Sequence, residues 1–191
     1  METVRFLKEF LRNRHTMGAV APSSPHLAER MMEVAEVWKA DRVVELGPGL
    51  GALTGAIFDV LPRQSDYLGV DLNEDFVVKL RERFPGRRFE AGAAELFDFG
   101  AVWPDGDGYD AVISGLPWTM FPESLQVKIL DRVLEGLRKG GRFATFAYWG
   151  FHWMPKGKRF RELLHERLPG VESSRVVLNN MPPAFVYVAR R

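Results

Sequence analysis

The sequence predicts an α/β protein with a Rossmann-like, seven-stranded doubly wound sheet, an antiparallel C-terminal hairpin and additional N-terminal helices. Three observations predict this fold. Short apolar runs alternate with helical patterns along most of the chain, a glycine-rich loop follows the first run, and no helix separates the last two runs. Such alternation is typical of a parallel sheet that helices cover on both faces.

The individual elements follow from periodicity and from end signals. Residues 2–15 place apolar side chains on one side of a helix, and Ser23 or Ser24 caps a second helix that has Pro25 in its first turn and runs to about Lys39. Beyond residue 40, apolar runs predict strands and amphipathic periods predict helices. The expected strands are 42–46, 66–71, 87–91, 109–115, 140–149, 171–180 and 183–191, and the expected helices between them are 50–61, 73–84, 122–137 and 156–168.

Length and composition limit the kinds of protein that the chain can be. A chain of 191 residues favours one domain, here residues 40–191, preceded by an amphipathic helix and a helix that caps the active site in residues 1–39. The 26 basic and 25 acidic residues nearly cancel, so net charge identifies no polyanionic partner. The absence of cysteine excludes disulfide bonds and thiolate zinc sites, and we expect no metal site. No apolar run is long enough to span a bilayer, and the charged first residues do not resemble a secretory signal.

The glycine-rich loop VVELGPGLGALT predicts a cofactor site. Gly47, Gly49 and Gly51 permit a tight turn and close backbone approach at a helix N-terminus, although the same glycines satisfy a loose dinucleotide fingerprint. The Glu45 carboxylate would repel a pyrophosphate but can hold an ammonium group. Asp71 ends the next strand, where an acid grips ribose hydroxyls. Each feature alone also fits an ordinary turn or helix cap, and together they fit S-adenosylmethionine at least as well as a dinucleotide.

These residues resemble the class I S-adenosylmethionine-dependent methyltransferases, over about residues 40–191. The resemblance implies that Glu45 and the three glycines line the methionine end of the cofactor, which becomes S-adenosylhomocysteine, and that Asp71 and Leu72 hold the ribose. It also implies that the segment AGAAEL flanks the adenine. Many relatives carry an acid where this chain has Ala93, so a backbone group at Ala94 or the Glu95 side chain is expected to replace that contact.

The segment SGLPW follows the fourth predicted strand, where nucleobase methyltransferases often carry Asn- or Asp-Pro-Pro-Tyr or Asn-Leu-Pro-Tyr. Here Gly115 replaces the polar residue that polarises a planar amine. Ser114 and Gly115 would clear room for an alkyl amine, and Trp118 would offer it a cation–π face. An ordinary strand glycine with Trp118 packed in the core is an equally good interpretation of the residue types.

The chain resembles a narrower family through GAVAPSS, ELGPGLGALT, SGLPW and NNMPPAFVY. It is similar to bacterial phospholipid N-methyltransferases, which are relatives in fold of the rRNA adenine dimethylases. The resemblance implies stepwise methylation of the phosphatidylethanolamine headgroup toward phosphatidylcholine. We also expect a monomer without a nucleic-acid partner, located in the cytoplasm and peripheral on the inner face of the cell membrane.

Two segments have the composition of a membrane-contacting surface. The first helix carries Phe6, Leu7, Phe10 and Leu11 on one side and basic residues on the other, as in helices that lie on anionic bilayers. The segment YWGFHWMPKGKRFR places indoles, Trp153 among them, beside lysines and arginines. A terminal helix packed on its own domain fits the first segment nearly as well, and single-stranded nucleic acid or a solvated basic helix also fits the second.

The chemistry requires a base, because an alkyl ammonium must lose a proton before it can attack. His15, just before GAVAPSS, is the expected proton acceptor, and Tyr148 is expected to contact the amine. Trp149 would complete an aromatic cage around it, and Lys156 or Arg159 near the cavity mouth would contact the lipid phosphate. The alternatives are an RNA or rRNA adenine N6-methyltransferase and a non-catalytic lipid-binding module.

Overall fold

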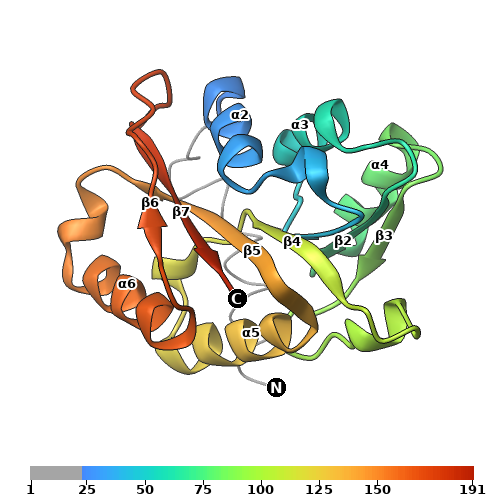
Figure 1. Ribbon diagram of the computed structural model, residues 1–191. Coiled ribbons are helices and arrows are strands. Elements are labelled where there is room, and N and C mark those ends of the chain that lie inside the picture. The colour runs from blue at the N-terminus through green and yellow to red at the C-terminus, as the bar shows by residue number, and fades with distance from the viewer. Residues whose placement is uncertain (1–22) are drawn as a thin grey trace.

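The computed structural model describes residues 23–191, so the predicted helix at 2–15 lies outside the described residues. Figure 1 shows helices on both faces of a central sheet. The helices are α2 (Pro25–Val34), α3 (Ala52–Val60), α4 (Glu74–Arg83), α5 (Glu123–Gly136) and α6 (Pro155–Arg167), with short 3-10 turns η1 (Val37–Lys39), η2 (Gly100–Val102), η3 (Trp118–Met120) and η4 (Phe151–Trp153). The strands are β1 (Arg42–Leu46), β2 (Asp66–Asp71), β3 (Arg88–Ala91), β4 (Tyr109–Ser114), β5 (Leu137–Tyr148), β6 (Glu172–Ser173) and β7 (Ala184–Arg190).

The seven strands form one sheet in the order β3-β2-β1-β4-β5-β7-β6. The first five are parallel, and β7 is antiparallel to both β5 and β6. The predicted α/β doubly wound sheet with an antiparallel end is therefore confirmed. Strand order reverses between β1 and β4, and ligands of such sheets bind beyond the carboxyl ends of the strands at this point.

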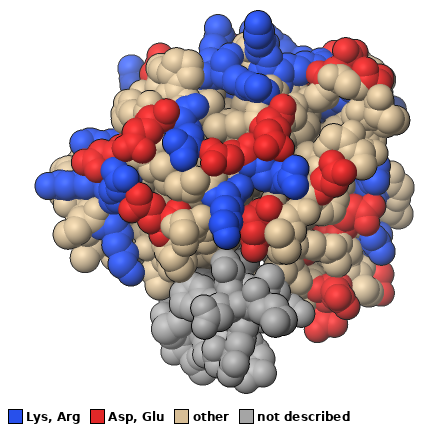
Figure 2. All heavy atoms as spheres, turned by 90° about the horizontal axis from the view of Figure 1, so that it is seen from below, with Lys and Arg blue, Asp and Glu red and all other residues tan. Residues whose placement is uncertain are grey.

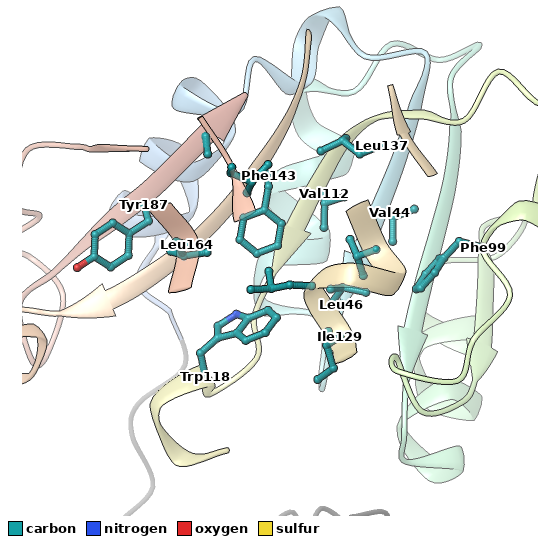
Figure 3. Packing of buried hydrophobic residues seen from close by; sticks show 14 of the residues in the cluster. Val44, Leu46, Phe99, Val112, Trp118, Ile129, Leu137, Phe143, Leu164 and Tyr187 are labelled. Atoms are coloured by element: carbon teal, nitrogen blue, oxygen red, sulfur yellow. The ribbon is translucent and has the colours of Figure 1, made fainter. Parts of the chain in front are cut away.

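Two hydrophobic clusters fill the space between the sheet and its two helical layers. Helices α2, α3 and α4 pack on one face, and α5 and α6 pack on the other. The close view in Figure 3 shows the second cluster, in which Val44, Val112 and Phe143 from the sheet lie near Ile129 and Leu164 from the helices. None of the helices in residues 23–191 is long and apolar enough to cross a membrane.

The helix α2 begins as predicted but ends earlier than expected. The Ser24 hydroxyl accepts a hydrogen bond from the Leu27 amide, which confirms the cap, and Pro25 lies in the first turn. The helix stops at Val34 because Glu36 adopts a left-handed conformation with φ of 51°, which no α-helix accommodates. A separate 3-10 turn then leads into β1.

The prediction of a strand over 171–180 is wrong for most of its length. Only Glu172–Ser173 forms a regular strand, followed by one isolated bridge between Val177 and Ala184. The amide of Val186 donates to the Ser174 hydroxyl rather than to a strand carbonyl. Because a side chain takes the place of a backbone acceptor, the ladder ends there and the chain leaves the edge of the sheet.

Candidate active site

A cavity opens at the carboxyl edge of the sheet, at the point where strand order reverses. Its lining includes Gly47 after β1, Leu72 after β2, Ala94 and Glu95 after β3, and Gly115 after β4. Asp71, the last residue of β2, also lines it. These residues are far apart in the sequence, and the parallel strands bring them together because their carboxyl ends share one edge.

The loop after β1 has glycine at each of its three left-handed positions. Gly47, Gly49 and Gly51 have φ of 67°, 59° and 87°, in the left-handed region. At Gly47 a Cβ atom would also lie 2.7 Å from a methyl group of Leu116, so the loop after β1 and the loop after β4 touch at this residue. Gly47 lines the cavity, whereas Gly49 and Gly51 do not.

Asp71 is buried at the end of β2 and binds the glycine loop. One carboxylate oxygen accepts a hydrogen bond from the Gly49 amide at 2.9 Å, and the other accepts from the Asn73 amide at 2.9 Å. The carboxylate therefore fixes the loop while it faces the cavity. This position suits the predicted contact with ribose hydroxyls.

Glu45 lies on the α3 side of β1, fully buried and outside the cavity lining. One carboxylate oxygen accepts hydrogen bonds from the hydroxyls of Thr54, at 2.8 Å, and of Tyr67. The other oxygen has no hydrogen-bond partner among the described residues. Burial raises the pKa of Glu45 to about 7, although both hydrogen bonds oppose this effect. The structure thus supplies a buried acceptor behind the glycine loop, but it does not bring Glu45 to the cavity wall.

Glu95, in the segment AGAAEL, brings a carboxylate to the cavity. It lines the cavity, and one of its carboxylate oxygens is buried without a hydrogen-bond partner among the described residues. An unpaired buried acceptor is costly unless a ligand satisfies it. Glu95 therefore suits the exocyclic amine of an adenine, the contact for which Ala93 has no side chain. With Asp71 and the glycine loop, this acceptor shows that the residues present fit S-adenosylmethionine.

The structure corrects the prediction that Ser114 and Trp118 contact the substrate. Trp118 is 2% exposed, and its indole stacks on Phe160 of α6 with ring centroids 5.2 Å apart. The indole N–H donates to the Ser114 hydroxyl at 3.0 Å, and Ser114 is itself fully buried. Figure 3 shows Trp118 within the hydrophobic cluster. Both side chains therefore hold the turn after β4 onto the core.

Gly115 lines the cavity, but the structure requires glycine there for loop packing, whereas we expected it to make room for the substrate amine. A Cβ atom there would lie 3.0 Å from the carbonyl oxygen of Gly47. The Gly115 amide donates to the Leu46 carbonyl at 2.9 Å, so the two loops pack backbone against backbone. Glycine at this position lets the loops after β1 and β4 meet at the floor of the cavity.

The expected aromatic cage is not assembled. Trp118 packs against Phe160 in the core, whereas Trp149 packs against Trp153 at 5.1 Å. Tyr148 has its ring contacts with Phe146 and Phe151. Tyr148 and Trp149 follow β5 at the same edge as the cavity, but neither contributes to its lining.

Arg159 is exposed on α6 and is already paired with acids. Its guanidinium lies 2.7 Å from a Glu123 carboxylate oxygen, 3.4 Å from Glu162 and 3.2 Å from Glu166. Figure 2 shows Lys and Arg interspersed with Asp and Glu over the face of the molecule seen from below. Because three carboxylates already pair with its guanidinium, Arg159 does not fit the predicted role of a phosphate contact. His15, Phe6, Leu7, Phe10 and Leu11 lie outside the described residues.

Several cavity residues were missed by reasoning from the sequence. Phe76, Leu116, Pro117, Phe121 and Ile129 contribute apolar surface to the lining. They belong to ordinary apolar helical or loop positions, so residue type gave no signal. Pro117 and Phe121 flank Trp118, which the sequence favours as a site residue because of its indole.

The fold and the site define an S-adenosylmethionine-dependent methyltransferase of class I. A family model described as "Methyltransferase domain" matches residues 43–141, and the chain belongs to this family. The fold is also that of an O-methyltransferase from Bacillus cereus in complex with S-adenosylhomocysteine, with a TM-score of 0.68 and 14% sequence identity, covering 98% of this chain and 91% of that one.

Two sequence relatives differ in how much of the chain they match. Ornithine lipid N-methyltransferase from Singulisphaera acidiphila is 30% identical over 190 residues, which covers 97% of this chain and 94% of the relative. Ribosomal RNA small subunit methyltransferase A from Prochlorococcus marinus is 30% identical over 131 residues, which covers 56% of this chain and 46% of the relative. The similarity to the lipid enzyme thus extends nearly end to end, and that to the ribosomal RNA enzyme does not.

Proposed function

We propose that this protein transfers methyl groups from S-adenosylmethionine to the primary amine of a membrane aminolipid, with phosphatidylethanolamine as the substrate and its mono- and dimethyl forms as further substrates. The observation that carries the proposal is the nearly full-length similarity to a lipid N-methyltransferase. Phosphatidylethanolamine and ornithine lipids share a primary alkyl amine beside a polar headgroup. The relative and the proposed substrate therefore agree in the class of amine.

The site after β4 supports an alkyl amine over a nucleobase amine. Gly115 stands where many nucleobase methyltransferases carry Asn or Asp, and it lines the cavity. Leu116, Pro117 and Phe121 form an apolar wall beside it. A planar exocyclic amine would find no amide or carboxylate at this wall among the described residues, whereas an uncharged alkyl amine needs chiefly room and exclusion of water.

The reaction needs binding, alignment and removal of one proton. The cofactor, when bound, supplies a methyl group activated by its sulfonium. Asp71 and Glu95 would hold its ribose and adenine, and the glycine loop would leave room for its methionine end. Before its nitrogen could accept that methyl group, the lipid ammonium would have to give its proton to a base of this chain. His15 is our proposed base, and Tyr148 our proposed amine contact.

The proposal places the protein at the inner face of the cell membrane as a peripheral monomer on an anionic bilayer, without a nucleic-acid partner. The predicted amphipathic helix with Phe6, Leu7, Phe10 and Leu11 supports this location through its sequence pattern alone. The main competing function is methylation of adenine in ribosomal RNA, which the shorter similarity to the ribosomal RNA enzyme favours.

Transfer of labelled methyl groups tests the proposal. The purified protein receives labelled S-adenosylmethionine with vesicles of phosphatidylethanolamine, vesicles of ornithine lipid, or total RNA, and each fraction is extracted and counted. We expect label in phosphatidylethanolamine, and none with Asp71→Ala, which removes the ribose contact. Label in RNA alone, from a protein that binds the cofactor, would overturn the proposal; label in ornithine lipid alone would replace the substrate and keep the class.

A further inference from the structure

Exposed large hydrophobic side chains gather at one edge of the molecule. Residues 23–191 contain twelve of them, and nine lie in loops at the carboxyl edge of the parallel strands, where the cavity opens. Scattered exposed hydrophobic residues are normal, but a group at one edge indicates a contact surface. Six of the nine follow β4 or β5 or lie just before β7, and we call this group the apolar edge: Met120, Trp149, Phe151, Trp153, Met154 and Met181.

Ring packing and backbone contacts hold the aromatic residues of the apolar edge in place. Trp149 packs on Trp153 with centroids 5.1 Å apart, and its amide donates to the Pro183 carbonyl at 2.7 Å. A Cβ atom at Gly157 would lie 2.4 Å from the Phe151 carbonyl oxygen, so α6 approaches the η4 turn as closely as a backbone can. Phe151 and Trp153 nevertheless remain 55% and 58% exposed. The rings are therefore held outward in a fixed arrangement before any partner binds.

Cations border the apolar edge. Lys156 and Lys158 are exposed in the first turn of α6, directly after Met154. Neither forms an ion pair with any carboxylate in the part of the chain that the structure describes, whereas the neighbouring Arg159 pairs with three. Indole rings beside lysines suit the headgroup layer of an anionic bilayer, where rings lie between the acyl chains and water.

We propose that the apolar edge inserts into the headgroup layer of an anionic phospholipid bilayer and so turns the mouth of the cofactor cavity toward the lipid headgroups. This inference rests on the proposed function. A lipid amine can reach the cavity while its acyl chains stay in the bilayer only if the bilayer lies against the edge where the cavity opens. The apolar edge occupies that position, and the three exposed large hydrophobic residues outside the carboxyl edge, Trp38, Val60 and Val78, lie in α- or 3-10 helices.

Vesicle binding by the full chain tests the surface. Flotation with vesicles of phosphatidylglycerol and phosphatidylcholine, without aminolipid, compares Phe151→Ser/Trp153→Ser with the matched pair Trp38→Ser/Val78→Ser. Trp38 and Val78 are 44% and 53% exposed, close to the values of the tested pair. We expect the edge variant to lose about tenfold in vesicle affinity and the matched variant less than about twofold. Equal affinities in the two variants would overturn the inference.

Fluorescence quenching locates the contact directly. Vesicles that contain brominated phosphatidylcholine should quench the tryptophan fluorescence of the wild type, and Trp149→Phe/Trp153→Phe should abolish most of this quenching while Trp38→Phe leaves it. Undiminished quenching in the double variant would show that another part of the chain, residues 1–22 included, makes the bilayer contact.

Methyl transfer to lipid in vesicles and to dissolved lipid tests the membrane surface and the proposed function separately. Trp153→Ser/Met154→Ser, which keeps the Phe151 ring against the proposed amine contact Tyr148, should lose methyl transfer to phosphatidylethanolamine in vesicles but keep transfer to a short-chain phosphatidylethanolamine dissolved as monomers. Full activity on vesicles would overturn the membrane surface and leave the proposed function intact. If the variant loses vesicle binding but the wild type methylates neither form of phosphatidylethanolamine, the membrane surface would be supported and the proposed substrate would be wrong.

Discussion

Glu45 shows how a single buried carboxyl group links the cofactor loop to the free energy of unfolding. Burial and, to a smaller extent, the charge of Asp71 favour the neutral form, whereas Tyr67 and Thr54 donate hydrogen bonds that favour the charged form. Burial is the larger effect, so the pKa in the folded state is about 7, above the ordinary value of 4.5. The folded protein therefore binds more protons than the unfolded chain between these two values.

Because the folded protein binds more protons, the free energy of unfolding should depend on pH. The variant Glu45→Gln, which cannot titrate at this position, is the reference. Relative to Glu45→Gln, the free energy of unfolding of the wild type should fall as pH rises from about 4.5 to about 7, by about 3 kcal/mol in total. Urea unfolding at several pH values measures it. Tyr67→Phe, which removes a donor to the carboxylate, should extend the fall to higher pH. Parallel curves for the wild type and Glu45→Gln would contradict the assignment.

Gly115 carries a second prediction at the scale of the residue. In Gly115→Ala the new methyl group meets the Gly47 carbonyl oxygen at 3.0 Å and displaces the glycine loop from Asp71. We expect the affinity for S-adenosylmethionine to fall about tenfold, which corresponds to about 1.4 kcal/mol, in a protein that still folds. Titration calorimetry measures the affinity. Gly55→Ala is the control, because a Cβ atom there meets nothing within 4 Å, and it should bind the cofactor as the wild type does.

The residues of the cofactor site could be predicted from the sequence much better than those of the substrate site. Gly47, Asp71, Leu72 and Glu95 lie at the cavity because their positions at strand ends determine where they face. Trp118 was misjudged because its burial depends on Phe160, which the chain supplies from a distant helix. Residue type cannot distinguish an indole that stacks in the core from one that walls a pocket.

At the scale of elements, prediction succeeded where local patterns were strong. The bounds of β1 and β2 agree with the apolar runs that predicted them, and the helices and parallel strands follow the expected order. Strand β6 was overpredicted because it is an edge strand with a single neighbour, β7, and the Ser174 hydroxyl ends the pairing. An interaction between residues 174 and 186 is not visible in the pattern of either segment.

The start of α2 is joined to the loop before β7 through one buried side chain. The Asn180 amide oxygen accepts from the Ser24 amide at 2.9 Å, and its amide nitrogen donates to the Pro182 carbonyl at 2.7 Å. Asn180 is 3% exposed, so loss of both contacts leaves buried backbone groups unsatisfied. This contact orders the segment NNMPP against the helix that opens the described part of the chain.

Replacing Asn180 should therefore loosen two elements together. We expect Asn180→Ala to lower the free energy of unfolding by about 2 kcal/mol, from two lost hydrogen bonds. Asn180→Asp keeps the acceptor for Ser24 but buries a carboxylate with one oxygen against the Pro182 carbonyl, so its loss at neutral pH should be at least as large. Urea unfolding gives the free energies, and amide exchange at Ser24 checks the contact. Equal stability of the wild type and Asn180→Ala would show that the contact contributes nothing.

At the scale of the whole molecule, charge and apolar surface are distributed differently. Basic and acidic residues are nearly equal in number and interspersed on the face shown in Figure 2, which gives no continuous basic field there. Exposed hydrophobic residues instead concentrate at the carboxyl edge of the sheet, beside the cavity. This arrangement favours a partner that is recognised through an apolar contact at the mouth of the site, as a bilayer would be, over an extended polyanion.

The central claim, methylation of an aminolipid amine, is tested most directly by production of the protein in a bacterium that makes phosphatidylethanolamine but no methylated derivatives of it. Lipids and ribosomal RNA from the same cells are then analysed by mass spectrometry, with Asp71→Ala as the inactive reference. Our account predicts N-methylated phosphatidylethanolamine in cells with the wild-type protein, none with Asp71→Ala, and unchanged adenine methylation in the RNA. Unchanged lipids together with newly methylated adenine would contradict it.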